Sequence, residues 1–272
     1  MIAGLASIVK NRFINSLQYR AAAVAGLLTQ IFWGLIMVMV MDAFYRGSAG
    51  PVPISIRQVC NYIWLGQAFL ALLPWSFDKG IEAMVRDGRV SYDFVRPQSV
   101  YAVWFARALG WRTAAALLRA VPLLLFAALG LPAVGLEHLA LSLPVSLPAF
   151  AAFSASMLAA VMLGCSIVVL LNISLIWTIS GRGTVMILNA VVTLFSGMVI
   201  PLPLYPTGLQ KLLTFLPFRG LTDAPFRLFT GHIPANSLPA VILHQLSWTL
   251  IFILSGVLLL RKGKVRLIVQ GG

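Results

Sequence analysis

Long apolar runs recur along this chain and limit its fold more than any other feature. A helix that is apolar on every side needs lipid or protein all around it. The chain is 60% hydrophobic and only 10% charged, and its apolar runs approach the roughly 20 residues that cross a bilayer. We therefore predict an all-α polytopic membrane protein of one domain, residues 1–272, with six transmembrane helices. The expected spans are residues 21–45, 59–77, 113–136, 146–171, 184–200 and 236–260.

The charge distribution predicts the orientation of these spans. The net charge is +13, from 20 Lys and Arg against 7 Asp and Glu. In a membrane protein such an excess belongs to cytoplasmic loops beside anionic lipid, and nucleic acid is not expected as a partner. With a cytoplasmic N-terminus, 14 of the basic residues lie inside, 5 lie outside and 1 lies within a span. We therefore expect both termini to be cytoplasmic.

The longest predicted inner loop, residues 78–112, holds a concentration of charge that is unusual for this chain. Glycines bound a short stretch, residues 80–88, whose apolar residues have helical spacing. We expect a short helix on the inner membrane surface, with an apolar face beside a charged one. The apolar residues are Ile81, Met84 and Val85, and the charged ones are Glu82, Arg86, Asp87 and Arg89.

Two other segments are expected to lie outside the regular spans. Residues 1–20 carry an apolar stripe opposite basic and polar residues, which predicts an interfacial helix. Residues 201–235 contain six prolines yet remain largely apolar, which is unlike a solvated loop. We expect a re-entrant pair of short helices there, on the outer side and before the last span. A simple extracellular cap is the alternative.

Arg119 is the one clear charge inside a predicted span. Arg112 lies seven residues earlier, which is about two helical turns, so both side chains should project from one face. Exposing Arg119 to lipid near the bilayer centre would cost roughly 2.5 to 3.5 kcal/mol. It should therefore reach the inner headgroups, or face a substrate path or a subunit contact.

Motifs for catalysis are absent from the sequence. The three histidines are scattered, and the patterns His-Glu-x-x-His, Gly-x-Ser-x-Gly and the Walker phosphate loop do not occur. The two cysteines, Cys60 and Cys165, lie in different apolar runs and form no Cys-x-x-Cys pair. We expect no catalytic residue, metal or cofactor in this chain, which cannot hydrolyse ATP by itself.

Three motifs, in this order and spacing, resemble a known family. They are NSLQYR (residues 15–20), DGRVSYDFVRP (residues 87–97) and FSGMVIPLPLYPTGLQKLLTFLPFRGLTDAPFRLFTG (residues 195–231). With the expected topology, they resemble the type-two permeases of ATP-binding cassette (ABC) exporters. The likeness is nearest to the six-span viologen- or daunorubicin-type exporter permeases.

The resemblance implies a dimeric permease, of two identical or two different subunits, in the bacterial plasma membrane. Cytoplasmic ABC ATPase subunits would bind it and would use ATP and magnesium. It also implies that residues 80–88 form the coupling helix that sits in a cleft of the ATPase. Phe195, which opens the third motif, joins Arg112 and Arg119 as a candidate for the substrate path or a subunit contact.

Two other classes of function remain open from the residues alone. One is an integral membrane enzyme acting on lipid, and the other is a channel or scaffold subunit that works without ATP. Drugs, lipids, peptides and glycans would all suit an apolar path, so the residues do not indicate the substrate.

Overall fold

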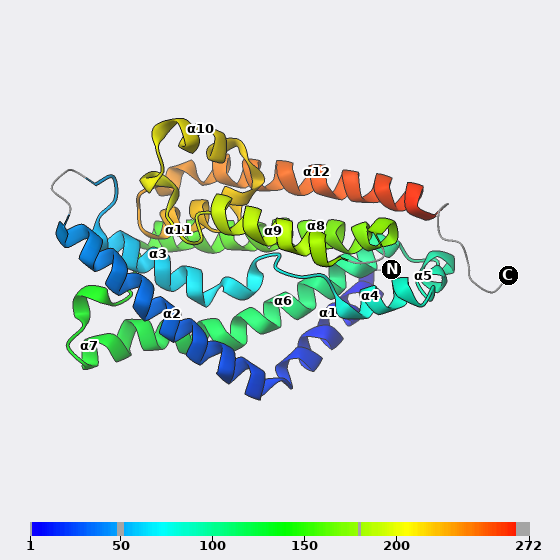
Figure 1. Ribbon diagram of the computed structural model, residues 1–272, viewed down its shortest axis with the longest axis horizontal. Helices are drawn as coiled ribbons and strands as arrows, with labels where there is room; N and C mark the ends of the chain where they lie inside the picture. Colours follow the sequence, from blue (N-terminus) through cyan, green and yellow to red (C-terminus); the bar gives the residue numbers. More distant parts are fainter. Residues whose placement is uncertain (1, 48–51, 179–180, 265–272) are drawn as a thin grey trace.

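The computed structural model describes residues 2–47, 52–178 and 181–264. Within these ranges every regular element is helical, which confirms the predicted all-α fold. The helices lie side by side along the long axis of the molecule (Figure 1). Short helices and turns gather at the two ends of this bundle.

Four helices in the described part are long and apolar enough to cross a membrane. The first is α2 (Arg20–Gly47). The second is α6 (Val100–Leu125), and this helix continues through a π-helical turn (Phe126–Gly130) into α7 (Leu131–Ala133). The others are α8 (Leu147–Thr178) and α12 (Leu238–Lys264). Because α6 begins at Val100, residues 100–112 of the predicted inner loop belong to a long helix.

The second and fifth predicted spans are only partly helical. They correspond to α3 (Ile56–Ala68, 13 residues) and α9 (Arg182–Phe195, 14 residues). At 1.5 Å per residue each helix is about 20 Å long, shorter than a hydrocarbon core of about 30 Å. After α3, Leu73 adopts an extended backbone because Pro74 disfavours the helical conformation of the residue before it. After α9, Gly197 has a φ of +84°, which ends the helical path.

Helix α8 forms the centre of the bundle and is mostly buried by α6, α11 and α12. Small residues repeat every four positions along it, and all are buried: Ala152, Ser156, Ala160 and Gly164. At one of them the side chain of Gln245 on α12 donates to the Ser156 carbonyl (3.0 Å) and the Gly220 carbonyl (2.7 Å). The small-residue face therefore serves packing within the chain.

The two ends of the bundle differ in composition. One end holds α1 (Ile2–Leu17), α4 (Lys79–Arg86), α5 (Ser91–Val95) and the basic last turn of α12 (Figure 1). The other holds the start of α3, α7, α10 (Thr207–Phe215) and α11 (Asp223–Phe229). The segments predicted to be cytoplasmic thus share one end. The last predicted inner charge, Arg266, lies outside the described residues.

The proline-rich segment, residues 201–235, contains two short helices joined by 3₁₀ turns (Leu202–Leu204 and Pro217–Gly220). Helix α11 is buried at the end of the bundle, where Phe226 contacts Tyr62 of α3 edge to face with ring centroids 5.2 Å apart. Helix α10 lies at the surface and exposes Leu212 and Phe215. The pair of short helices is present as predicted, and its depth in a membrane stays a prediction.

Candidate functional site

The surface helix α4 is fixed at its beginning by Asp78. Its carboxylate oxygen Oδ1 accepts hydrogen bonds from the backbone N–H groups of Gly80 (2.8 Å) and Ile81 (3.3 Å). Asp78 is therefore the N-cap, and it satisfies donors that the first turn leaves free. The helix ends at Arg86, and Gly88 follows with a φ of +73°. The predicted helix, residues 80–88, is thus present with its boundaries shifted by one or two residues.

Asp78 also connects α4 to three other helices. Its second oxygen, Oδ2, lies 3.0 Å from Nε and 2.9 Å from Nη2 of Arg107 on α6, and 3.7 Å from Nη2 of Arg12 on α1. The Asp78 backbone N–H donates to the side-chain oxygen of Asn172 on α8 (2.9 Å). One residue therefore joins the start of α4 to α1, α6 and α8.

The apolar face of α4 packs on its own domain. Ile81 is fully buried, and Met84 and Val85 are partly buried against the same cluster. This cluster comes from the segment after α4 and from α6, α8 and α12, and its other buried members are Val90, Tyr101, Trp104, Val169, Ile173 and Leu260. A partner on the surface would not reach Ile81, whose contacts lie within this chain.

The opposite face of α4 is charged and exposed. Arg86, Asp87 and Arg89 are exposed, Glu82 is partly so, and an Arg89 nitrogen pairs with Asp87 at 2.8 Å. Such an exposed pair contributes little stability, so these charges remain available to a partner.

Two apolar side chains extend this surface into α5. Tyr92 is 67% exposed and Val95 is 80% exposed. Neither residue was predicted to belong to this surface, because the helical pattern used to predict it covers only residues 80–88. The DGRVSYDFVRP motif contained the signal, since an aromatic residue between charges on a surface helix is typical of a contact patch.

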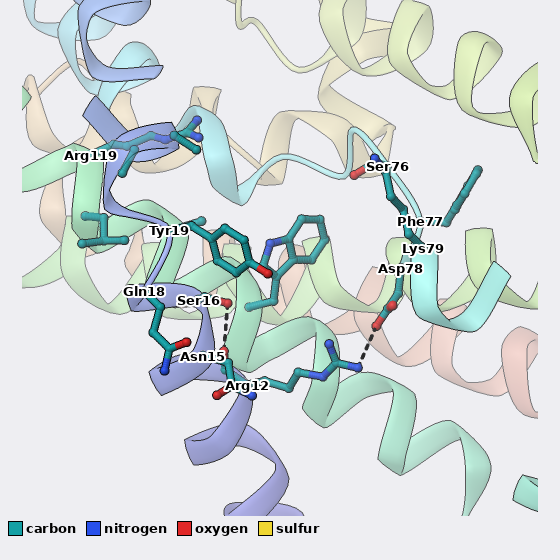
Figure 2. Close-up of a pocket in the computed structure, with 15 residues that line it drawn as sticks. Arg12, Asn15, Ser16, Gln18, Tyr19, Ser76, Phe77, Asp78, Lys79 and Arg119 are labelled. Carbon is teal, nitrogen blue, oxygen red and sulfur yellow. Dashed lines mark hydrogen bonds and ion pairs between the residues drawn. The ribbon is translucent and has the colours of Figure 1, made fainter. Parts of the chain in front are cut away.

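A cavity of about 750 Å³ lies between the α1–α2 joint, the segment before α4, and α6. Figure 2 shows Tyr19 between Arg119 and the segment from Ser76 to Lys79. Polar and basic groups dominate the labelled lining: Arg12, Asn15, Ser16, Gln18, Tyr19, Ser76, Asp78, Lys79 and Arg119. Since Asp78 already pairs with two arginines, the lining carries excess positive charge.

Arg119 lies in this cavity, against α2. A Cβ built at Gly26 of α2 would stand 2.7 Å from the guanidinium carbon of Arg119, so glycine provides the space for it. Among the described residues, Arg119 forms no hydrogen bond or ion pair, and its side chain is partly exposed. Its position in a cavity at the predicted inner end fits both a snorkelling side chain and a substrate-facing one.

Arg112 and Phe195 lie elsewhere. Arg112 is 2% exposed and donates to the backbone carbonyl groups of Ala71 (3.2 Å) and Leu73. Both carbonyls lie where the helix breaks after α3, and the Leu73 carbonyl also accepts from the Trp75 backbone N–H (2.8 Å), so Arg112 adds to the hydrogen bonds that stabilise that break. Phe195 ends α9 and contacts Phe218 with ring centroids 6.4 Å apart. The structure does not bring Arg112, Arg119 and Phe195 to one site.

Comparison with protein families agrees with this arrangement. A family model described as "ABC-2 family transporter protein" matches residues 55–271, which is more than half of the chain. The match begins at α3, includes α4 and the proline-rich segment, and leaves out α1 and α2. No curated protein matches the chain. The chain therefore belongs to the ABC-2 transporter family and is a permease component of an ABC transporter.

Proposed function

We propose that this chain is the transmembrane permease subunit of an exporter related to the viologen- or daunorubicin-type systems. In this proposal the chain crosses the bacterial plasma membrane six times, with α3 and α9 as short crossings, and both termini are cytoplasmic. A separate cytoplasmic ABC ATPase subunit hydrolyses ATP with magnesium, and this chain binds no cofactor. The end that carries α1, α4 and α5 faces the cytoplasm.

One observation carries the proposal: α4 exposes a charged face and is anchored to three other helices through Asp78. Arg86, Asp87 and Arg89 offer both signs of charge, which favour a single register against a partner. Tyr92 and Val95 add apolar area that a partner would bury. The surface has the mixture of charge and apolar area that an ATPase cleft requires.

The anchoring of α4 explains how motion of a partner would reach the spans. When the ATPase subunits close on ATP, they displace α4. Because Asp78 binds Arg107 of α6 and Arg12 of α1, these helices follow the start of α4. The buried side chain of Ile81 transmits the same displacement to α6, α8 and α12 through its apolar cluster.

The inner cavity is the proposed entry for substrate. It lies beside the start of α4, where the ATPase would bind, and Arg119 has no partner there among the described residues. Substrate would leave at the opposite end, past α10 and α11. The positive lining favours anionic or zwitterionic substrates over cationic ones.

A second permease subunit would complete the path. Exposed apolar side chains on α2 include Leu28, Phe32 and Trp33, and those on α12 include Leu246 and Leu250. Lipid covers such faces in a monomer, and a second subunit, identical or different, would cover part of them in a dimer.

The coupling role is tested by reversing the charges of α4. The variant combines Arg86→Glu with Asp87→Lys, and it is compared with Arg57→Glu, an exposed residue at the opposite end. We expect the double variant to lose copurification of the ATPase and ATP-driven transport, while its folding in detergent is unchanged. The control should keep both activities. Normal ATPase association and transport in the double variant would rule out α4 as the coupling element.

A further inference from the structure

A second cavity, of about 440 Å³, lies at the end opposite to α4. It is formed by the end of α10, the 3₁₀ turn Pro217–Gly220, α11 and the first turns of α12. Its polar lining consists of Thr214, Arg219, Arg227, His232, Ser237 and His244. Every one of these side chains can donate a hydrogen bond, and no carboxylate of the described residues lines the cavity.

The two arginines keep most of their donors free. Arg219 donates from Nη1 to the Thr214 carbonyl (3.3 Å), and Arg227 donates from Nη1 to Asp223 (3.2 Å). The Nε atoms of both are buried and have no partner among the described residues. A guanidinium carries five N–H donors, so each has several that are not used within the chain. Because the Nε atoms are buried, a ligand in the cavity would bind through the Nη groups that the described residues leave unused.

The nearby carboxylate of Asp223 does not line the cavity, although its Oδ2 pairs with Arg227, which does. Asp223 is fully buried, and its Oδ1 accepts from the Tyr62 hydroxyl (3.2 Å) and the Leu202 backbone N–H (3.3 Å). Its single charge balances one of the two arginines, so the cavity keeps excess positive charge. Burial, and next the charge of Arg227, lower the pKa of His232. Its ring is therefore neutral near pH 7 and offers one N–H.

We propose that this cavity binds a phosphate group. Guanidinium groups match phosphate oxygens in geometry and charge, and the histidine and hydroxyl groups supply further donors. The remaining wall is apolar, from Ile233, Pro234, Ala240 and Val241, which suits a ligand with a phosphate at one end. The group belongs either to a phospholipid headgroup or to a soluble phosphate. Phosphate binding at this site does not require the ATPase, so its test is independent of the test of the coupling role of α4.

The test uses the purified full-length chain in a neutral detergent, with two probes. Inorganic phosphate, titrated calorimetrically against a chloride blank, represents the soluble source. Phosphatidylglycerol, offered in nanodiscs with phosphatidylcholine and counted by native mass spectrometry after release, represents the lipid source. The variant is Arg219→Gln, and the matched control is Lys211→Gln, an exposed residue of α10 that does not line the cavity.

We expect at least one probe to bind wild type and the control equally, and to bind Arg219→Gln about tenfold more weakly or worse. Phosphate binding with this pattern identifies a soluble ligand, and selective retention of phosphatidylglycerol identifies a lipid. If Arg219→Gln fails to fold, His232→Gln replaces it, because His232 is partly exposed and makes no hydrogen bond within the described residues. The proposal is overturned if neither probe binds to wild type. It is also overturned if the variant binds the probe as tightly as the control does.

Discussion

Replacing Asp78 by Asn tests whether α4 is anchored as we infer. Asparagine keeps a side-chain oxygen for the N-cap, so the helix start survives, and only the charged contacts are lost. The contacts that disappear are those of Oδ2 with Arg107 at 2.9 and 3.0 Å and with Arg12 at 3.7 Å. The Arg107 side chain is 17% exposed, so water replaces the carboxylate only in part.

The free energy that Asp78→Asn removes from the anchoring of α4 can be estimated from these contacts. A hydrogen bond to a charged group contributes about 1.5 to 3 kcal/mol, and we assign this value to the Arg107 pair as a whole. The Arg12 contact is longer and more exposed, so it adds little. A loss of this size raises the opening equilibrium of α4 on the order of 10- to 100-fold. Asp78→Ala should open α4 further, since it also removes the cap, which contributes about 1 kcal/mol.

Hydrogen exchange of peptides covering α4, in the purified protein, measures this opening. Asp87→Asn is the matched control: it removes the same charge from the opposite end of α4, where Asp87 is the C-cap, and its pair with Arg89 is exposed and contributes about 0 to 1 kcal/mol. We expect the peptides of α4 to exchange hydrogen faster in Asp78→Asn than in wild type. In Asp87→Asn their exchange rate should stay close to that of wild type. Equal exchange in the two variants, or faster exchange spread evenly over the whole chain, would refute the anchoring role of Asp78.

Three further predictions address stability and orientation. Arg112→Leu should destabilise the protein by about 1 to 3 kcal/mol, because it removes the buried guanidinium that donates to the Ala71 and Leu73 carbonyl groups; its unfolding midpoint in detergent should fall. Gly34→Ala should lower the free energy of unfolding by about 1 to 3 kcal/mol, since a Cβ there would lie 2.5 Å from the buried Trp64 ring. An unfolding midpoint equal to that of wild type would contradict this packing. The cysteine of Arg86→Cys should react with an impermeant thiol reagent only after cells are opened, whereas that of Lys211→Cys should react in intact cells. The reverse pattern would show that the chain has the opposite orientation in the membrane.

Local signals in the sequence were sufficient for the elements whose structure depends on nearby residues. The alternation of apolar and charged positions predicted α4, and its apolar side is buried while its charged side is exposed, as expected. The small residues from Ala152 to Gly164, spaced four apart in the sequence, likewise form a buried packing face within the chain. In both cases a periodic pattern along one helix carries the information.

The features that the sequence did not reveal depend on contacts between distant segments. Arg112 was grouped with Arg119 because of their spacing, but its role follows from hydrogen bonds to the carbonyl groups of Ala71 and Leu73, where the helix breaks before Pro74. The histidines looked scattered, yet the packing of α11 on α12 brings His232 and His244 beside two arginines. Hydropathy also predicted helices at the second and fifth spans that continue past the ends of α3 and α9. It measures the length of an apolar run and does not detect where the backbone leaves the helix.

Helix α8 gives the two ends of the molecule a common element. Near one end Asn172 accepts from the backbone of Asp78, and toward the other Ser156 shares Gln245 with the turn before α11. Sixteen residues, or roughly 24 Å of continuous helix, separate these two contacts. Because α8 is buried along most of its length and has no proline between them, it cannot bend freely, and a shift at α4 must move it as a unit. In the proposed assembly, this rigidity would connect an ATPase bound at the α4 end mechanically to the α10–α11 region at the other end.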